Sequence, residues 1–138
     1  MEFSRRDLAL LLPALAAQAS AQTPALPSRA LPFDDLPLKV NGKNRSWAML
    51  NGVNHSGFAI EVHQSELAPG EQPHAPHQHV HEELVLLWAG TVDYTVNGAT
   101  TRLGPGSAGY AASNDLHGMR NVGDTPARYF VVALGKDS

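Results

Sequence analysis

The chain has 138 residues, no cysteine, 43% hydrophobic residues and a formal net charge of −3, which describes one small soluble domain. The lack of cysteine excludes disulfides, thiolate metal sites and a cysteine nucleophile. The mild negative charge, without any basic stripe in the sequence, argues against nucleic acid as a partner.

The first 21 residues have the composition of an export signal. Arg5-Arg6 precedes an apolar stretch at 8–17, and Ala19-Ser20-Ala21 offers a small-x-small cleavage site. The paired arginines resemble a twin-arginine signal. A membrane anchor is the alternative, but the apolar stretch is short for a span and is interrupted by Pro13. We therefore expect a mature protein that begins at Gln22, is periplasmic or secreted, and is not stably inserted in the membrane.

Residues 22–38 are rich in proline and alanine and show no period, which predicts a linker or an extended N-terminal arm before a domain at 39–138. In that domain almost nothing has a helical period, and short segments alternate with turn signals. Asn97-Gly98 supplies the two positive-φ residues of a type I′ hairpin turn. The pattern predicts an all-β sandwich or barrel. Strands are expected at 47–50, 58–67, 83–88, 91–96, 99–103, 107–111, 117–122 and 127–134.

Four side chains of metal-ligand type occur in two short blocks. His77, His79 and Glu83 lie in the first block, and His117 follows about a third of the chain later. The i, i+2, i+6 spacing of the first three is typical of one face of a strand, where side chains return every second residue. Three imidazoles and one carboxylate can therefore converge on one divalent ion inside a β structure.

The same residues resemble the two motifs of the cupin superfamily. The first motif consists of glycine, a spacer, His-x-His, glutamate and a second glycine. This chain matches it with Gly70, His77-Gln78-His79, Glu83 and Gly90, and its spacer is one residue longer than usual. The second motif is matched by Gly106, His117 and Asn121. Ala112 and Asn114 stand where proline and glycine are commoner, and asparagine tolerates a left-handed backbone better than other non-glycine residues.

The resemblance implies a single-domain jelly-roll β-barrel of the cupin-2-like kind. It also implies a metal site made of His77, His79, Glu83 and His117. The ion would be one divalent transition metal (Fe, Mn, Ni, Co, Cu or Zn), because imidazole and carboxylate together suit all of them. His81 shares the parity of the ligands and is expected near the barrel mouth, while His74 is expected at the surface.

The expected function is that of a metal-dependent enzyme with a small-molecule substrate. The leading hypothesis is an oxygenase for a small enolic or phenolic substrate, in which Glu83 could leave the ion and act as a catalytic base. The alternatives are a non-oxidative isomerase, lyase or hydrolase, and a periplasmic module that binds metal or ligand without turnover. No lysine or arginine is placed persuasively by the sequence to hold a carboxylate. By alternation, the candidates for the pocket lining are Phe58, Ile60 and Val62 or their neighbours, with Val85, Leu87, Tyr94, Tyr110, Met119 and Phe130.

The resemblance further implies a homodimer, since single-barrel cupins commonly pair through their sheets. Residues 31–51 could serve there as an exchanged edge strand that covers an open sheet edge.

Overall fold

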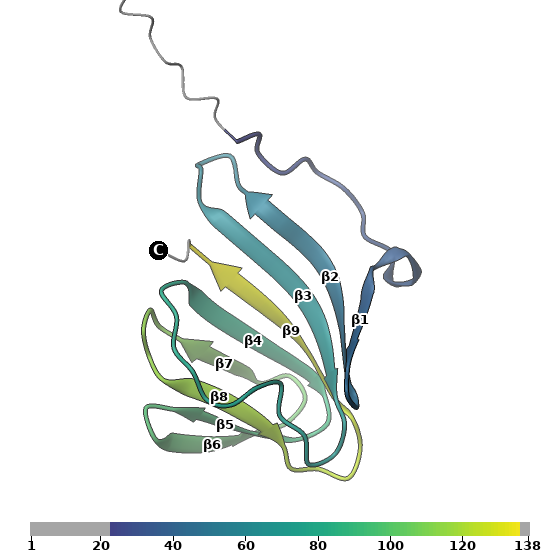
Figure 1. Cartoon of the computed structure of the whole chain (residues 1–138), viewed down its shortest axis with the longest axis vertical. Coiled ribbons are helices and arrows are strands. Elements are labelled where there is room, and N and C mark those ends of the chain that lie inside the picture. The colour runs from purple at the N-terminus through teal and green to yellow at the C-terminus, as the bar shows by residue number, and fades with distance from the viewer. Residues whose placement is uncertain (1–22, 136–138) are drawn as a thin grey trace, which may run out of the picture.

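The computed structural model describes residues 23–135, and nearly all regular structure in that range is β. Two antiparallel sheets form the body of the molecule (Figure 1). The larger sheet contains, in spatial order, β1 (Leu38–Asn41), β2 (Asn44–Val53), β3 (Ala59–Leu67), β9 (Ala127–Leu134), β4 (Glu82–Ala89) and β7 (Ala108–Ala111). The smaller sheet contains β6 (Ala99–Leu103), β5 (Val92–Val96) and β8 (His117–Asn121). The expected all-β jelly-roll barrel is confirmed.

Each strand expected from the sequence is present, although β2 extends further in both directions than 47–50. The sequence prediction missed β1, a short edge strand whose four residues are all exposed. Before it, the chain forms the 3₁₀ turn η2 (Phe33–Asp35) and runs beside β2, where the Leu26 amide donates to the Val53 carbonyl at 2.8 Å. The predicted export signal lies outside the described residues. Within residues 23–135, no helix is long and apolar enough to cross a membrane.

The core lies between the two sheets and is built by strand alternation. On β9 and β4 the odd-numbered side chains point toward the smaller sheet, as the buried positions indicate, and the pairing of β3 with β9 places the odd-numbered side chains of β3 on the same face. Burial of each large apolar side chain contributes about 1.5–3 kcal/mol. The buried cluster consists of Leu67, Val85, Leu87, Val92, Tyr94, Leu103, Met119, Ala127, Tyr129 and Val131.

Two turns require unusual backbone conformations that the sequence supplies. Asn97 and Gly98 have φ values of 48° and 83°, as the predicted type I′ turn between β5 and β6 needs. Gly90, between β4 and β5, has φ 83°, and a Cβ placed there would lie 2.6 Å from the Cα of Ala127. The glycine that ends the first motif is therefore needed for both its backbone angle and its close packing.

Asn121, the last residue of the second motif, is fully buried and joins three segments. Its Nδ2 donates to the carbonyls of Leu67 and Thr125, both at 2.9 Å, and its Oδ1 accepts from the Gly123 amide at 2.9 Å. The side chain thereby satisfies backbone groups at the end of β3 and in the turn between β8 and β9.

Replacing Asn121 with alanine should lower the free energy of unfolding by about 2–4 kcal/mol, because two carbonyls and one amide lose their buried partner. Urea unfolding measures this change. Asn51→Ala is the matched control, since Asn51 is an exposed asparagine on β2, and its effect should stay within about 0.5 kcal/mol. Equal effects of the two substitutions would contradict this account of Asn121.

Candidate metal centre

The four predicted ligands come from three parts of the fold. His77 and His79 lie in the segment 68–81 between β3 and β4, Glu83 lies on β4, and His117 begins β8. The strand-type spacing of the first three is therefore not carried by one regular strand. His77 forms only an isolated antiparallel bridge with His117. Prolines at positions 73 and 76 explain the irregularity, because proline removes a donor from the ladder.

Backbone hydrogen bonds hold the His-x-His segment against the second motif. The His77 amide donates to the His117 carbonyl at 3.0 Å, and the His117 amide donates back to the His77 carbonyl at 2.9 Å. The Asn114 amide donates to the His79 carbonyl at 2.8 Å, and Asn114 adopts φ 63°. Asparagine thus occupies the left-handed position where the family pattern commonly has glycine.

The ligand atoms converge around one point. One ring nitrogen each of His77, His79 and His117 lies within 4.8 Å of the others. Glu83 faces them, with Oε2 at 3.6 Å from His79 Nε2 and Oε1 at 3.6 Å from His117 Nε2. Metal–ligand bonds of about 2.0–2.2 Å place two ligands of one ion about 3–4 Å apart. The separations are too long for hydrogen bonds, but they match ligands that share a divalent ion.

The inward nitrogens lack partners, and two of the rings are held in a defined tautomer. His77 Nδ1, His79 Nε2 and His117 Nε2 are buried without a hydrogen-bond partner. His79 Nδ1 lies 2.8 Å from the His81 carbonyl, and His117 Nδ1 lies 2.9 Å from the Asp115 carbonyl. Because a carbonyl only accepts, each Nδ1 carries the proton and each Nε2 presents a lone pair. The donor set therefore fits a divalent transition metal.

Two further histidines lie against this group. The His81 ring stacks on the His79 ring, with centroids 3.5 Å apart and planes 12° apart. Ligand atoms of His79, His81 and Glu83 also lie within 4.8 Å of one another, which makes a second possible triad that shares two members with the first set. His74 contacts the His77 ring edge-on, with centroids 4.0 Å apart. The histidine-rich segment thus offers one more possible ligand than the motif assigns.

The cluster shifts the titration of its members and neighbours. Burial, followed by the nearby His74, His117 and His79, lowers the pKa of His77 to about 4. Burial, followed by the charge of Glu83, raises the pKa of Tyr94 to about 12. The metal-free site therefore holds His77 neutral and ready to coordinate at neutral pH, and it keeps Tyr94 as a hydrogen-bond donor.

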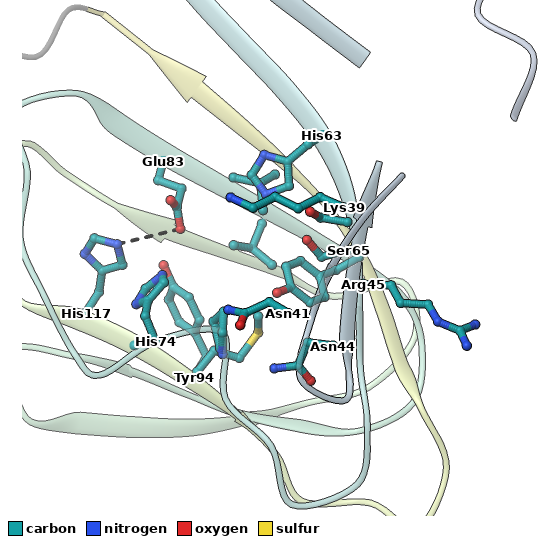
Figure 2. A pocket seen from close by; sticks show the side chains of 17 residues that line it. Lys39, Asn41, Asn44, Arg45, His63, Ser65, His74, Glu83, Tyr94 and His117 are labelled. Atoms are coloured by element: carbon teal, nitrogen blue, oxygen red, sulfur yellow. Dashed lines mark ion pairs between the residues drawn. The ribbon is translucent and has the colours of Figure 1, made fainter. Parts of the chain in front are cut away.

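A cavity of about 240 Å³ opens beside the ligands, and Glu83 and His117 form part of its wall (Figure 2). Of the candidates taken from alternation, Val85, Tyr94 and Met119 line the cavity. Phe58 and Tyr110 are exposed instead, and the wall on β9 consists of Tyr129 and Val131 rather than Phe130. On β3 the lining residues are His63 and Ser65, neighbours of the expected position 62. Sequence reasoning missed Lys39 and Asn41, which line the cavity from β1.

Comparison with family models places these features in a known group. The model described as "Cupin domain" matches residues 63–133, which is about half of the chain and includes all four predicted ligands. This chain belongs to the cupin family. Comparison with curated proteins finds no match.

Several solved cupin structures share the fold at low sequence identity. An RmlC-like cupin from Shewanella frigidimarina superposes with a TM-score of 0.67 at 15% identity, covering 83% of this chain and 95% of that one. KdgF from Halomonas sp. has a TM-score of 0.67 at 16% identity, covering 80% and 97%. A cupin-superfamily sugar phosphate isomerase from Silicibacter pomeroyi has a TM-score of 0.63 at 17% identity, covering 78% and 76%. At such identities the likeness establishes the fold alone.

The metal-free cupin should lose stability between about pH 6.5 and pH 4. In that window the unfolded chain binds a proton at His77 that the folded protein, with its lowered pKa of about 4, does not bind. Stability therefore falls as the pH falls, and above pH 6.5 this contribution is absent. Urea unfolding of chelator-treated protein at pH 7.5, 5.5 and 4.5 measures the slope.

A His77→Gln variant should show a shallower dependence on pH over the same window. His55→Gln is the matched control, because His55 is exposed and bonded to the Ser56 hydroxyl, and it should keep the slope of the parent. An unchanged slope in His77→Gln would contradict the assignment of this proton to His77.

Proposed function

We propose that this cupin is a metal-dependent enzyme for a small polar substrate. One divalent transition metal (Fe, Mn, Ni, Co, Cu or Zn) would be bound by His77, His79, His117 and Glu83. The observation that carries the proposal is the set of three buried imidazole nitrogens without a hydrogen-bond partner, two of which lie 3.6 Å from Glu83. Buried polar atoms without partners are costly, and coordination of an ion would satisfy all of them at once.

The bound ion would supply Lewis-acid polarisation of a substrate oxygen. Glu83 is the candidate general base, because its carboxylate borders the cavity in which the substrate would lie. Tyr94 is the candidate donor: its hydroxyl is buried without a partner, and its raised pKa keeps the proton in place. Val85 and Met119 restrict water on the apolar side of the same cavity.

The leading reaction class is oxygenation of a small enolic or phenolic substrate. The aromatic and apolar part of the cavity wall, Tyr94, Tyr129 and Val131, suits a planar ring or enol beside the metal ligands. The second candidate is an isomerase, lyase or hydrolase that needs no dioxygen. It is favoured by the presence of a base and a protonated phenol, Glu83 and Tyr94, in one cavity. A module that binds without turnover would need only the metal ligands.

Elemental analysis of residues 22–138, purified without added metal, should find about one transition metal per chain. His77→Ala and His117→Ala should each lose it, because each removes one of the four proposed ligands. His55→Ala, which alters an exposed histidine outside the cluster, should retain it. Chelation should lower the melting temperature of the parent, since an ion that binds only the folded state stabilises that state.

The outcome against the proposal is a metal content that no ligand substitution changes. If the metal is present, oxygen consumption with enolic and phenolic compounds separates the two enzyme classes. Uptake that depends on His117 supports the oxygenase. Conversion of a substrate without uptake supports the non-oxidative class, and saturable binding without any product supports the binding module.

We also propose that the cupin forms a homodimer through the outer face of the larger sheet. Leu86, Trp88, Tyr110 and Leu134 project from that face and are 40–52% exposed. Exposed apolar side chains gathered on one face often mark a protein–protein contact. Light scattering at micromolar concentration should give twice the chain mass. Tyr110→Lys should reduce it to one chain, and Phe58→Lys, in the turn between β2 and β3, should not. A monomeric parent would refute the dimer.

We also propose that the protein is exported before it acts, which the composition of residues 1–21 supports. The processed protein should begin at Gln22 and be recovered outside the cytoplasm. Mass spectrometry of the exported fraction tests this, and recovery of the full-length precursor in membranes would contradict it.

A further inference from the structure

The cavity wall opposite the metal ligands is polar and comes from the first three strands. Figure 2 shows Glu83 and His117 at one end of the cavity, and Lys39, Asn41, His63 and Ser65 toward the other. The sequence predicted apolar residues at most of the pocket positions.

The register of the larger sheet gives the spacing between the two ends. On its inner face, Glu61 of β3 pairs with Ala133 of β9, which pairs with Glu83 of β4. In the next inward-facing row, His63 pairs with Val131, which pairs with Val85. His63 and Glu83 thus lie on strands two spacings apart, about 10 Å between backbones. Lys39 reaches the same cavity from β1, two strands beyond β3. In these two rows β9 contributes Ala133 and Val131, a small and a medium side chain, and the cavity has room for a ligand several atoms long.

Lys39 is a cation turned into this cavity. In Figure 2 its amino group points inward, whereas Arg45, the other cation of the lining, points away. Arg45 pairs with Glu66, Nη1 to Oε1 at 3.8 Å. Among residues 23–135, no acidic side chain lies within 4.0 Å of the Lys39 amino group. An inward lysine without an anionic partner among the described residues can pair with an anion in the cavity.

His63 is held in place by a neighbouring carboxylate. His63 Nδ1 lies 2.9 Å and 3.1 Å from the two Glu61 oxygens, so Nδ1 carries a proton and donates to Glu61. This pair fixes the ring and leaves the Nε2 edge for the cavity that His63 lines. Ser65, two residues along the same face, adds a hydroxyl.

We propose that Lys39 and His63 form a subsite for an acidic group at the far end of the substrate. The substrate would be a small acid, with an oxygen function at the metal end and a carboxylate about two strand spacings away. The inference rests on the proposed function for the identity of the metal end. It deepens that function by naming the substrate class, which the ligand set alone does not determine.

Lys39 could instead protect the edge of the sheet, and this role predicts a different effect of its substitution. Lysine on an edge strand discourages pairing with other chains, and β1 is an edge strand. Under that role, substitution of Lys39 changes solubility or association and leaves ligand binding unchanged. Binding measurements with probes of defined length separate the two roles.

The probes are the α,ω-dicarboxylates from malonate to adipate, each compared with the monocarboxylate of equal carbon number. Isothermal titration calorimetry with the metal-loaded cupin gives both dissociation constants at each length. At the length that spans the cavity, the dicarboxylate should bind about tenfold more tightly, as one charge-assisted contact allows. Lys39→Gln and His63→Gln should each remove most of this preference.

Lys43→Gln is the matched control, because Lys43 lies in the β1–β2 turn, pairs with Glu71 at 3.7 Å and does not line the cavity. It should keep the preference, and thermal unfolding should show that all three variants fold. The subsite is overturned if no dicarboxylate binds more tightly than its monocarboxylate at any length, or if the Lys39→Gln variant keeps that preference.

Failure of the proposed function would be visible separately. Elemental analysis would then find no metal, and the monocarboxylates would not bind. If metal-free protein still bound dicarboxylates more tightly and this preference depended on Lys39, the subsite would be supported without the metal. If metal-free protein showed no such preference, the subsite would be overturned.

Discussion

The site depends on one pair of reciprocal backbone hydrogen bonds, between His77 and His117. This bridge fastens an irregular, proline-containing segment to the first residue of β8, and β8 itself belongs to the smaller sheet. Glu83 approaches from the larger sheet. The bridge therefore brings together groups from two sheets that share no ladder hydrogen bonds, and the barrel supplies the rigid frame that a loop alone would lack.

Much of this architecture could be predicted from the sequence because the signals are local. Each signal occupies only a few positions. Examples are the turn residues Asn97-Gly98, the short alternating strands and the glycine before β5. The convergence of the four side chains could be predicted because their spacing is distinctive for a family whose model matches the chain. The strand geometry inferred for His77 and His79 was wrong, because the spacing of side chains does not reveal whether backbone partners are available to them.

The far wall of the cavity could not be predicted for the same kind of reason. β1 has four exposed residues and follows a proline-rich stretch, so its only strand signal is its pairing with β2. On β3, Ile60 and Val62 suggest that the even-numbered side chains face inward, whereas His63 and Ser65 line the cavity. A shift of one position exchanges the two faces of a strand. The positions of His63 and Lys39 in the cavity wall therefore follow only from the long-range pairing of the strands.

The carbonyls of His81 and Asp115 have a consequence for how the site would acquire its ion. They hold two imidazoles in the coordinating tautomer before any ion arrives, so little ordering entropy remains to be lost on binding. A preorganised set of nitrogen and oxygen donors gains affinity for many divalent ions together, following the general order in which copper and zinc exceed manganese and iron. Rigidity of this kind gives tight binding without discrimination. The identity of the resident metal would then be decided by which ions surround the chain when it folds.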